Sequence, residues 1–366
     1  MKEKSRNLAL DLLRGAGIVL MVLGHYVHFD FFKAWLYAFH MPLFFVVSGV
    51  FFPTAETSVS FWGFVKKRAK SLLIPYATCG GLIALATLFL KGVDSARGVV
   101  LSLLWDNTSS EAGDAGTFWF LSALFFAEVL FFVLTHLIRN KPALLTVSFV
   151  ISAASVFLGN LVALPWALSP ALVALFFLAA GFVSAPCVRA PQPQLPHAFV
   201  RAVCLVVLGF LLTCFIGVGE VLLRGEPLSL ASVFSAARAG MRLGTYPGGL
   251  LFFANALLGV FAAYRLCLAL SHAAEKTAPI KALVRALSFC GKNSLYFLLF
   301  SSFFGNQISA LRDLVFVERL RFPFSYLFLF FQLCLIFALT LSTAKLFSKF
   351  PVSLLVGRGK PNRKEA

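Results

Sequence analysis

Four ionisable residues lie in stretches of the sequence that are otherwise apolar. Asp11, Arg14 and His25 interrupt the first apolar run, and Glu128 interrupts a later one. Ionisable groups are costly inside a membrane, and they usually face the interior of a bundle or a wet cavity. An imidazole can take a proton from an attacking hydroxyl, and a guanidinium can bind phosphate. These residue types therefore indicate proton transfer close to a bound anion.

The spacing of Arg14 and His25 places both side chains on one side of a helix. They are eleven residues apart, and eleven steps of 100° end within about 20° of three full turns, roughly 16.5 Å along the axis. Asp11 precedes Arg14 by three residues and can pair with it. We predict that Arg14 binds phosphates near the inner membrane surface and that His25 acts deeper as a general base or a nucleophile. The alternative is structural: Arg14 anchors the helix at the interface, and His25 bonds a neighbouring helix.

Four further positions extend this prediction. His40 is followed two residues later by a proline that can kink a helix, so His40 can face the same chamber as His25 or lie at its outer mouth. Glu128 can orient His25 or neutralise an arginine, and the sequence leaves both roles open. Trp105 and Trp119 can stack on a sugar, or they can be ordinary loop and interface aromatics.

A run of positive charge follows the second apolar stretch. Lys66, Lys67, Arg68 and Lys70 lie within five residues of one another. Cations in a connection between spans anchor its cytoplasmic side, and this role alone can explain them. The same charges can also clamp the phosphates of a cytosolic donor. A metal or haem site is not predicted, because ligation between two helices needs further paired histidines.

Long apolar segments must position these residues. Of the 366 residues, 60% are hydrophobic and 13% are charged, and a soluble domain has roughly twice that charged share. Mean hydropathy is +0.88, and apolar segments of about twenty residues, enough to span a bilayer, recur along the chain. We predict an all-α polytopic transmembrane bundle of about ten spans. Their approximate bounds are 8–28, 35–53, 71–90, 118–138, 143–163, 167–186, 202–222, 248–271, 293–311 and 324–346.

The distribution of positive charge predicts the topology. Lys and Arg number 32 against 15 Asp and Glu, a net charge of +17. In a soluble chain this excess suggests nucleic acid, but in a membrane protein it first indicates orientation, and no nucleic-acid partner is expected. Connections on one side of the predicted spans hold 22 of the cations and those on the other side hold 9, so we predict both termini in the cytoplasm. Residues 1–348 are predicted to form a single transmembrane domain, and 349–366 a short basic tail.

Several motifs together resemble those of the integral-membrane acyltransferase-3 family, which comprises bacterial glycan O-acetyltransferases and includes a fucose 4-O-acetylase-like group. In this order, over residues 8–125 and again near 291, the motifs are specific, whereas 140–285 matches only as generic spans. The matching segments are Leu10-Asp11-x-Leu-Arg14-Gly, Arg14 with His25, Phe39-His40-Met-Pro-Leu-Phe-Phe-x-x-Ser48-Gly, Lys67-Arg68 leading to Leu73-Ile-Pro-Tyr76, Trp119-Phe-Leu, and Gly291-Lys292-Asn293-Ser294-Leu295.

The resemblance implies a ten-span enzyme of the bacterial cytoplasmic (inner) membrane that transfers an acyl group, usually acetyl from acetyl-CoA. The implied acceptor is a sugar hydroxyl of a cell-envelope glycan or its lipid-linked precursor. His25 falls on the family's essential histidine, and Arg14 on its paired arginine. Lys292 joins the expected donor-binding residues. The expected substrate-binding residues are His40, Trp105, Trp119, Asn293 and Ser294. The expected partners are the lipid bilayer, acyl-CoA and the glycan acceptor.

A transporter or flippase is the alternative function. Asp11, Arg14, His25 and Glu128 would also suit a polar substrate pathway through a membrane. Transporters often contain inverted repeats and paired broken spans, and neither is recognisable in this sequence. We therefore favour the enzyme.

Overall fold

The computed structural model describes residues 7–27, 29–53, 60–158, 164–315, 324–349 and 352–357. Within these ranges the chain forms thirteen α-helices and four 3-10 helices, and the only β-type pairing is an isolated bridge between Gly240 and Thr245. The prediction of an all-α fold is confirmed. Residues 358–366 of the predicted tail lie outside the described residues.

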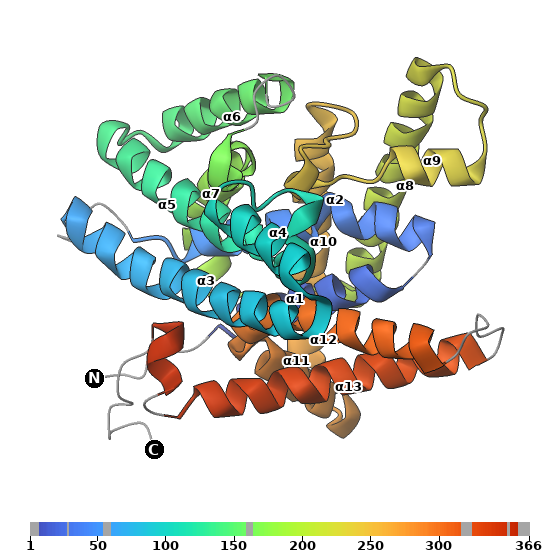
Figure 1. Cartoon of the computed structure of the whole chain (residues 1–366). Helices are drawn as coiled ribbons and strands as arrows, with labels where there is room; N and C mark the ends of the chain where they lie inside the picture. Colours follow the sequence, from blue (N-terminus) through green and yellow to red (C-terminus); the bar gives the residue numbers. More distant parts are fainter. Residues whose placement is uncertain are drawn as a thin grey trace. The chain divides into compact units, whose positions relative to one another are not determined.

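The helices follow one another from α1 near the N-terminus to α13 and η4 near the C-terminus (Figure 1). The α-helices are α1 (Leu8–Tyr26), α2 (Asp30–Val50), α3 (Phe61–Lys91), α4 (Val93–Leu104), α5 (Trp119–Leu137), α6 (Lys141–Leu158), α7 (Leu168–Arg189), α8 (Ala198–Arg224), α9 (Leu230–Ala236), α10 (Leu251–Ala273), α11 (Ala278–Lys292), α12 (Ser294–Val315) and α13 (Phe324–Phe347). The 3-10 helices are η1 (Ser110–Ala115), η2 (Pro165–Ala167), η3 (Met241–Leu243) and η4 (Val352–Val356).

Nine helices in the described part of the chain are long and apolar enough to cross a membrane: α1, α2, α3, α5, α6, α7, α8, α10 and α13. They coincide with nine of the ten predicted spans. The tenth, expected at 293–311, is also a helix, α12, but it is not among the nine. Its polar residues, including Ser301, Ser302, Asn306 and Gln307, lower its hydropathy.

Helix α3 begins earlier than predicted. The span was expected at 71–90, whereas the helix starts at Phe61, where the Ser60 hydroxyl caps it by accepting a hydrogen bond from the Gly63 amide at 3.1 Å. The basic residues at 66–70 therefore lie on the early turns of α3 and are not part of a loop.

The chain divides into two compact units. Unit 1 comprises Met1–Thr57, Val133–Val162 and Leu172–Ser294. Unit 2 comprises Ser58–Phe132, Ala163–Ala171 and Leu295–Ala366. Arg14, His25 and His40 thus belong to unit 1, whereas Glu128 and the basic residues at 66–70 belong to unit 2.

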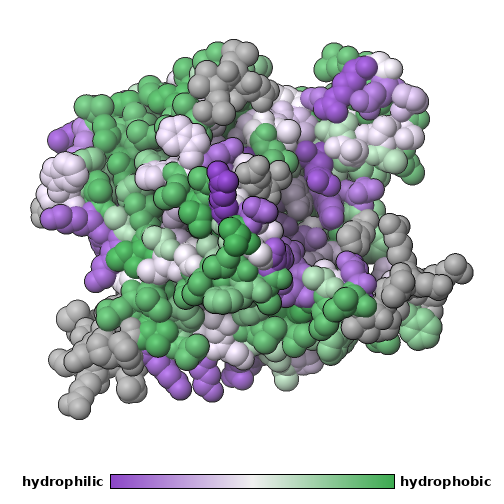
Figure 2. Space-filling view, in the orientation of Figure 1, coloured by the Kyte–Doolittle hydropathy of each residue, from purple (hydrophilic) through white to green (hydrophobic). Residues whose placement is uncertain are grey.

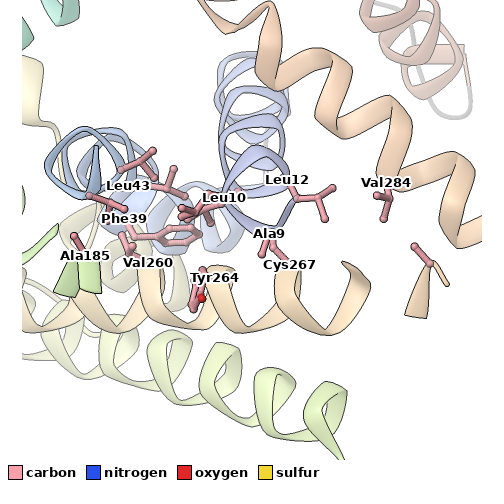
Figure 3. Close-up of a cluster of buried hydrophobic side chains, with 14 of the residues drawn as sticks. Ala9, Leu10, Leu12, Phe39, Leu43, Ala185, Val260, Tyr264, Cys267 and Val284 are labelled. Carbon is pink, nitrogen blue, oxygen red and sulfur yellow. The ribbon is translucent and has the colours of Figure 1, made fainter. Parts of the chain in front are cut away.

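Unit 1 is built around α1, which packs against α2, α10 and α11. Close packing rather than water exclusion holds helices together in a membrane, so these contacts fix the position of α1 and of the polar residues it carries. Buried side chains from these helices meet in one cluster (Figure 3), which includes Leu10 and Leu12 of α1, Phe39 and Leu43 of α2, Val260 and Tyr264 of α10, and Val284 of α11.

Unit 2 contains α3, α4 and a pair formed by α12 and α13. The paired helices lie side by side (Figure 1), and the ring centroids of Phe297 and Phe337 are 5.0 Å apart. The segment 352–357 packs against α3, where the Thr78 hydroxyl donates a hydrogen bond to the Leu355 carbonyl. The start of the predicted tail is therefore part of the folded unit.

The surface of the protein is rich in large apolar side chains. Figure 2 shows apolar residues, in green, over much of the face in view. Phe89, Leu223 and Leu314 are each at least 79% exposed. A protein in water rarely exposes contiguous apolar patches of more than several hundred Å², so this surface is suited to lipid. The structure is that of a multi-pass membrane protein.

Candidate active site

Helix α1 is continuous from Leu8 to Tyr26 and carries Asp11, Arg14 and His25. An unbroken helix keeps Arg14 and His25 on one stripe, about 16.5 Å apart along its axis. The His25 side chain is exposed, whereas Arg14 is half-buried. The expected ion pair between Asp11 and Arg14 remains a prediction.

Two glycines bring α11 against the first turns of α1. A Cβ atom at Gly15 would overlap the Leu287 carbonyl oxygen, and one at Gly291 would lie 2.6 Å from the Asp11 carbonyl oxygen. The two backbones therefore touch directly beside Arg14. Small residues at such crossings are typical of helices that pack closely in membranes.

The same crossing brings the end of α11 towards Arg14. Gly291 contacts the α1 backbone, and Lys292, the next residue, is exposed. The Asn293 side-chain amide donates to the backbone carbonyl four residues earlier at 2.9 Å, and Ser294 is half-buried at the start of α12. Of the predicted donor-binding residues, Lys292 therefore lies in the same part of unit 1 as Arg14.

A phenylalanine ring at the end of α2 contacts two guanidinium groups. The Cζ atoms of Arg14 and Arg189 lie 4.5 Å and 5.5 Å from the centroid of the Phe51 ring. Arg189, the last residue of α7, also donates a hydrogen bond to the Val50 carbonyl. Phe51 itself is 44% exposed. Two positive charges on one exposed ring form a site with the charge and the hydrogen-bond donors that phosphate requires.

His40 is buried in α2 next to the α1 stripe. Its Nδ1 donates a hydrogen bond to the Leu36 carbonyl oxygen at 3.0 Å, because a carbonyl can only accept. The His40 ring centroid lies 4.8 Å from that of Tyr37. His40 also interacts electrostatically with His25, so the two histidines share one neighbourhood in unit 1.

Three cations gather at the His25 end of α1. Lys33 and Arg242 interact electrostatically with His25, and Arg238 interacts with Lys33. Asp30 contributes a negative charge that also acts on Lys33. The side chains that act electrostatically on His25, Lys33 and Arg242, are thus both cationic.

A short loop carries two of these cations. The Arg238 Cζ atom lies 5.6 Å from the Tyr37 ring centroid, and the Tyr37 hydroxyl donates to the Gly24 carbonyl at 3.4 Å. Arg238 is thereby linked to the residue that precedes His25. Arg242 follows within the bridge that pairs Gly240 with Thr245.

In unit 2 the predicted donor clamp contains an ion pair. Arg68 forms an ion pair with Glu128, whose side chain is 1% exposed. The sequence left two roles open for Glu128, and this ion pair corresponds to the second, the neutralisation of an arginine. Lys66, Lys67 and Lys70 are exposed. The charges available to a phosphate on this helix are therefore chiefly those of the three lysines.

The two predicted sugar-stacking residues differ in exposure. Trp119 is buried at 6% exposed, as the first residue of α5. Trp105 is 69% exposed, and its backbone carbonyl accepts a hydrogen bond from the Trp166 amide at 3.0 Å. Of the two indoles, that of Trp105 is the one that an external ligand can reach.

Unit 2 also contains a closed polar cluster around Asp114. Its carboxylate is 2.7 Å from the Lys91 ammonium and accepts hydrogen bonds from the amides of Asn306 and Gln307 at 2.9 Å and 3.0 Å. Asp114 is only 2% exposed. Three donors around one buried carboxylate indicate a structural role, the joining of α3 and α12 to η1.

Sequence reasoning missed Arg189, Arg238 and Arg242 as members of a site. The available signal was their position: Arg238 and Arg242 lie in a segment predicted to be external, where the positive-inside rule does not call for cations. The sequence gives no such signal for Arg189. This residue lies in a connection predicted to be cytoplasmic, where cations are expected in any case. Its contact with Phe51 depends on how α7 packs against α2.

Across the described residues, no group of three or more His, Cys, Asp or Glu side chains is arranged so that it could hold a metal ion. The site consists of imidazole, guanidinium, ammonium and aromatic groups.

Comparison with known proteins identifies the family. Residues 7–344 match the acyltransferase domain that defines the acyltransferase-3 family. The chain belongs to the acyltransferase-3 family. This match covers both units, and the α1 residues Arg14 and His25 lie within the matched domain.

Two curated relatives are similar to part of this chain. Nodulation protein NolL of Mesorhizobium japonicum is 32% identical over 143 residues, which are 36% of each chain. Nodulation protein NolL of Sinorhizobium fredii is 35% identical over 132 residues, 33% of this chain and 34% of the relative. The chain spans about a third of the length of these relatives. No solved structure matches it.

Proposed function

We propose that this acyltransferase moves an acetyl group from acetyl-CoA to a sugar hydroxyl of a cell-envelope glycan or its lipid-linked precursor. The observation that carries the proposal is the arrangement on α1, where a two-arginine site lies at one end of a stripe and an exposed imidazole at the other. We place the enzyme in the cytoplasmic membrane of a bacterium, with residues 1–348 as one catalytic domain.

One donor molecule would extend along this stripe, with its phosphates at the Arg14 end and its thioester at the His25 end. Coenzyme A has a phosphate-bearing nucleotide end and a long uncharged arm that ends in the thioester. Arg14 and Arg189 beside Phe51 would bind the phosphates, and Lys292 would add a further charge. The arm would then follow α1, so that the thioester carbonyl reaches His25. In unit 2, Lys66, Lys67, Arg68 and Lys70 of α3 stay proposed as phosphate-binding residues.

The chemistry requires one proton to be moved. His25 takes the proton from the acceptor hydroxyl while that oxygen forms the new ester bond to the acetyl carbon. The carbon–sulfur bond of the thioester breaks, and the coenzyme A thiolate receives the proton from the imidazolium. His40, which interacts electrostatically with His25, is a positioning residue in this scheme. Asp11 would hold Arg14, and Glu128 would hold Arg68.

The acceptor would be bound by polar and aromatic groups. Trp105 and Trp119 remain proposed stacking residues, and Asn293 and Ser294 proposed hydrogen-bonding residues, for a sugar. Trp105 is the more accessible of the two aromatics. None of these assignments requires a metal ion.

The test is a transfer assay with the full chain in phospholipid vesicles. Vesicles receive acetyl-CoA labelled in the acetyl group and a glycolipid extract from the source cell envelope. We expect alkali-labile labelled acetyl esters on the glycan and weaker acetyl-CoA binding by Arg14→Gln. Intact labelled acetyl-CoA accumulating inside the vesicles, with no ester formed, would overturn the proposal in favour of transport.

A further inference from the structure

Helix α11 has one buried face and a broad exposed surface. It is 15 residues long and is not among the nine helices that could cross a membrane. Its buried face is apolar, because Ile280 and Leu287 pack against the core cluster of unit 1, to which Val284 belongs. Most of its other side chains are exposed. They divide into a group of cations and a group of apolar residues.

The cations of α11 lie on one stripe. Lys281, Arg285 and Lys292 are all exposed. At 100° per residue, Arg285 lies about 40° from Lys281 around the helix, and Lys292 lies about 20° from it. Lys281 and Arg285 are also four residues apart, a spacing at which like charges destabilise a helix. Among the residues that the structure describes, neither forms an ion pair with a carboxylate. Their charge is therefore available to an external anion.

Exposed apolar side chains lie beside this stripe on the same helix. Phe289 and Leu283 are 53% and 48% exposed, and Ala282 and Ala286 are exposed between them. These four residues cover about 120° of the helix surface, on the side away from the buried Val284. Water disfavours the apolar group, and acyl chains disfavour the cations. The boundary between headgroups and acyl chains satisfies both groups at once.

The position of α11 in the chain agrees with such a boundary. The candidate span α10 ends at Ala273, and α11 begins shortly afterwards at Ala278. Gly291 contacts the backbone of Asp11 in the first turns of α1, the end of α1 that is predicted to be cytoplasmic. The positive-inside rule concerns the cations of a connection whatever their arrangement. It does not explain a single cationic stripe beside exposed leucine and phenylalanine side chains.

We propose that Lys281 and Arg285 bind the headgroup phosphates of anionic phospholipids in the leaflet at the predicted cytoplasmic face. Leu283 and Phe289 enter the acyl region of that leaflet, and the cations stay at the depth of the headgroups. An ammonium and a guanidinium one turn apart supply several donors to phosphate oxygens. A zwitterionic headgroup is disfavoured, because its own cation would meet a stripe that is already positive. Lys292, on the same stripe, remains the donor-binding residue of the proposed function.

Lipid binding by the full chain in dodecyl maltoside micelles tests this surface. Dioleoyl-phosphatidylglycerol and dioleoyl-phosphatidylcholine are titrated separately, and bound lipid is resolved by native mass spectrometry. Wild type should bind phosphatidylglycerol more tightly, and equal affinity for the two lipids would overturn the proposal. Lys281→Gln and Arg285→Gln should each weaken binding of the first phosphatidylglycerol by about fivefold, and the double variant by about thirtyfold, at about 1 kcal/mol for each cation. The single variants give the same test if the double variant does not fold.

Arg201 provides the matched control. It is an exposed cation near the start of α8, also at the predicted cytoplasmic side. Unlike the cations of α11, it has no lysine or arginine four residues before or after it, where His197 and Leu205 stand. Arg201→Gln should bind phosphatidylglycerol as wild type does. Equal losses in Arg201→Gln and in the single α11 variants would show a diffuse charge effect and overturn the proposal.

Two further probes identify the source of the phosphate and separate the two proposals. Glycerol phosphate should bind more weakly than phosphatidylglycerol, because it lacks the acyl chains that Leu283 and Phe289 contact; equal affinity would show a site for free phosphate and overturn the lipid surface. The double variant should keep the wild-type Kd for acetyl-CoA. Loss of that binding would assign the two cations to the donor and overturn the inference. Wild-type protein that binds phosphatidylglycerol but not acetyl-CoA would refute the proposed donor while supporting the lipid surface.

Discussion

In unit 2 the buried carboxylate of Asp114 accepts contacts from Lys91, Asn306 and Gln307, and nothing more is needed to satisfy its charge. In unit 1 the exposed imidazole of His25 lies among cations, with Lys33 and Arg242 acting on it. The first cluster is closed by side chains of the protein itself. The second presents positive charge and an accessible ring. A polar group is thus structural where the chain completes its contacts, as at Asp114, and a candidate for function where it is exposed beside cations, as at His25.

The largest effect should follow from opening the closed cluster. Asp114→Ala removes an acceptor for three donors, two of which are amides left without that partner. We expect a loss of roughly 3–5 kcal/mol in the free energy of unfolding, as for a broken buried pair. Thermal unfolding in detergent measures it. Asp313→Ala is the control, because Asp313 forms its pair with Arg312 while 67% exposed, and surface pairs contribute about 0–1 kcal/mol. Similar losses in both variants would contradict the structural role of Asp114.

A smaller loss should follow from widening the helix crossing beside Arg14. Gly15→Ala places a methyl group against the Leu287 carbonyl, and overpacking of this kind costs about 1–3 kcal/mol. Gly219→Ala is the matched control, because nothing lies within 4 Å of a Cβ atom at this glycine of α8. It should be neutral or slightly stabilising. An unfolding temperature that drops equally in both would show that the crossing is not tightly packed.

Removing the second guanidinium from the Phe51 ring should weaken donor binding with little effect on the fold. Arg189→Gln loses a charge near Arg14, and we expect the Kd for acetyl-CoA to rise by about tenfold. Isothermal titration measures it, with Arg201→Gln, an exposed cation of α8, as the control. An unchanged Kd for acetyl-CoA in Arg189→Gln would show that Arg189 takes no part in donor binding.

The smallest effect should come from the open cluster. Arg238→Gln should change the free energy of unfolding by no more than about 0.5 kcal/mol, as for surface substitutions generally, and relief of repulsion should make the change stabilising in low salt. Unfolding curves at two salt concentrations test this. A clear destabilisation would show that Arg238 is structural and would remove the contrast with Asp114.

The all-α membrane fold and nine of its spans could be predicted because both follow from local hydropathy, which a sequence displays directly. The α1 stripe could be predicted for the same reason, since a helix fixes the angle between Arg14 and His25. The segment expected at 293–311 is helical, as α12, but polar residues such as Asn306 and Gln307, which contact Asp114 in unit 2, give it a lower hydropathy than the nine.

Contacts between distant segments could not be predicted from one sequence. Glu128 had two possible partners, and its ion pair with Arg68 depends on how α3 and α5 pack. The meeting of Arg14 and Arg189 on Phe51 likewise joins the ends of three helices. Hydropathy and periodicity describe each helix alone, so they carry no information on which helix ends meet.

The central claim is that His25 handles the proton in acyl transfer, and its most direct test is the rate of that step in His25→Gln. Glutamine keeps a similar size and polarity but cannot act as a base near neutral pH. At saturating labelled acetyl-CoA we predict a rate of glycan acetylation lower than wild type by about 10²–10⁴-fold, with an unchanged Kd for acetyl-CoA and an unchanged unfolding temperature. A rate within a few-fold of wild type would contradict the account.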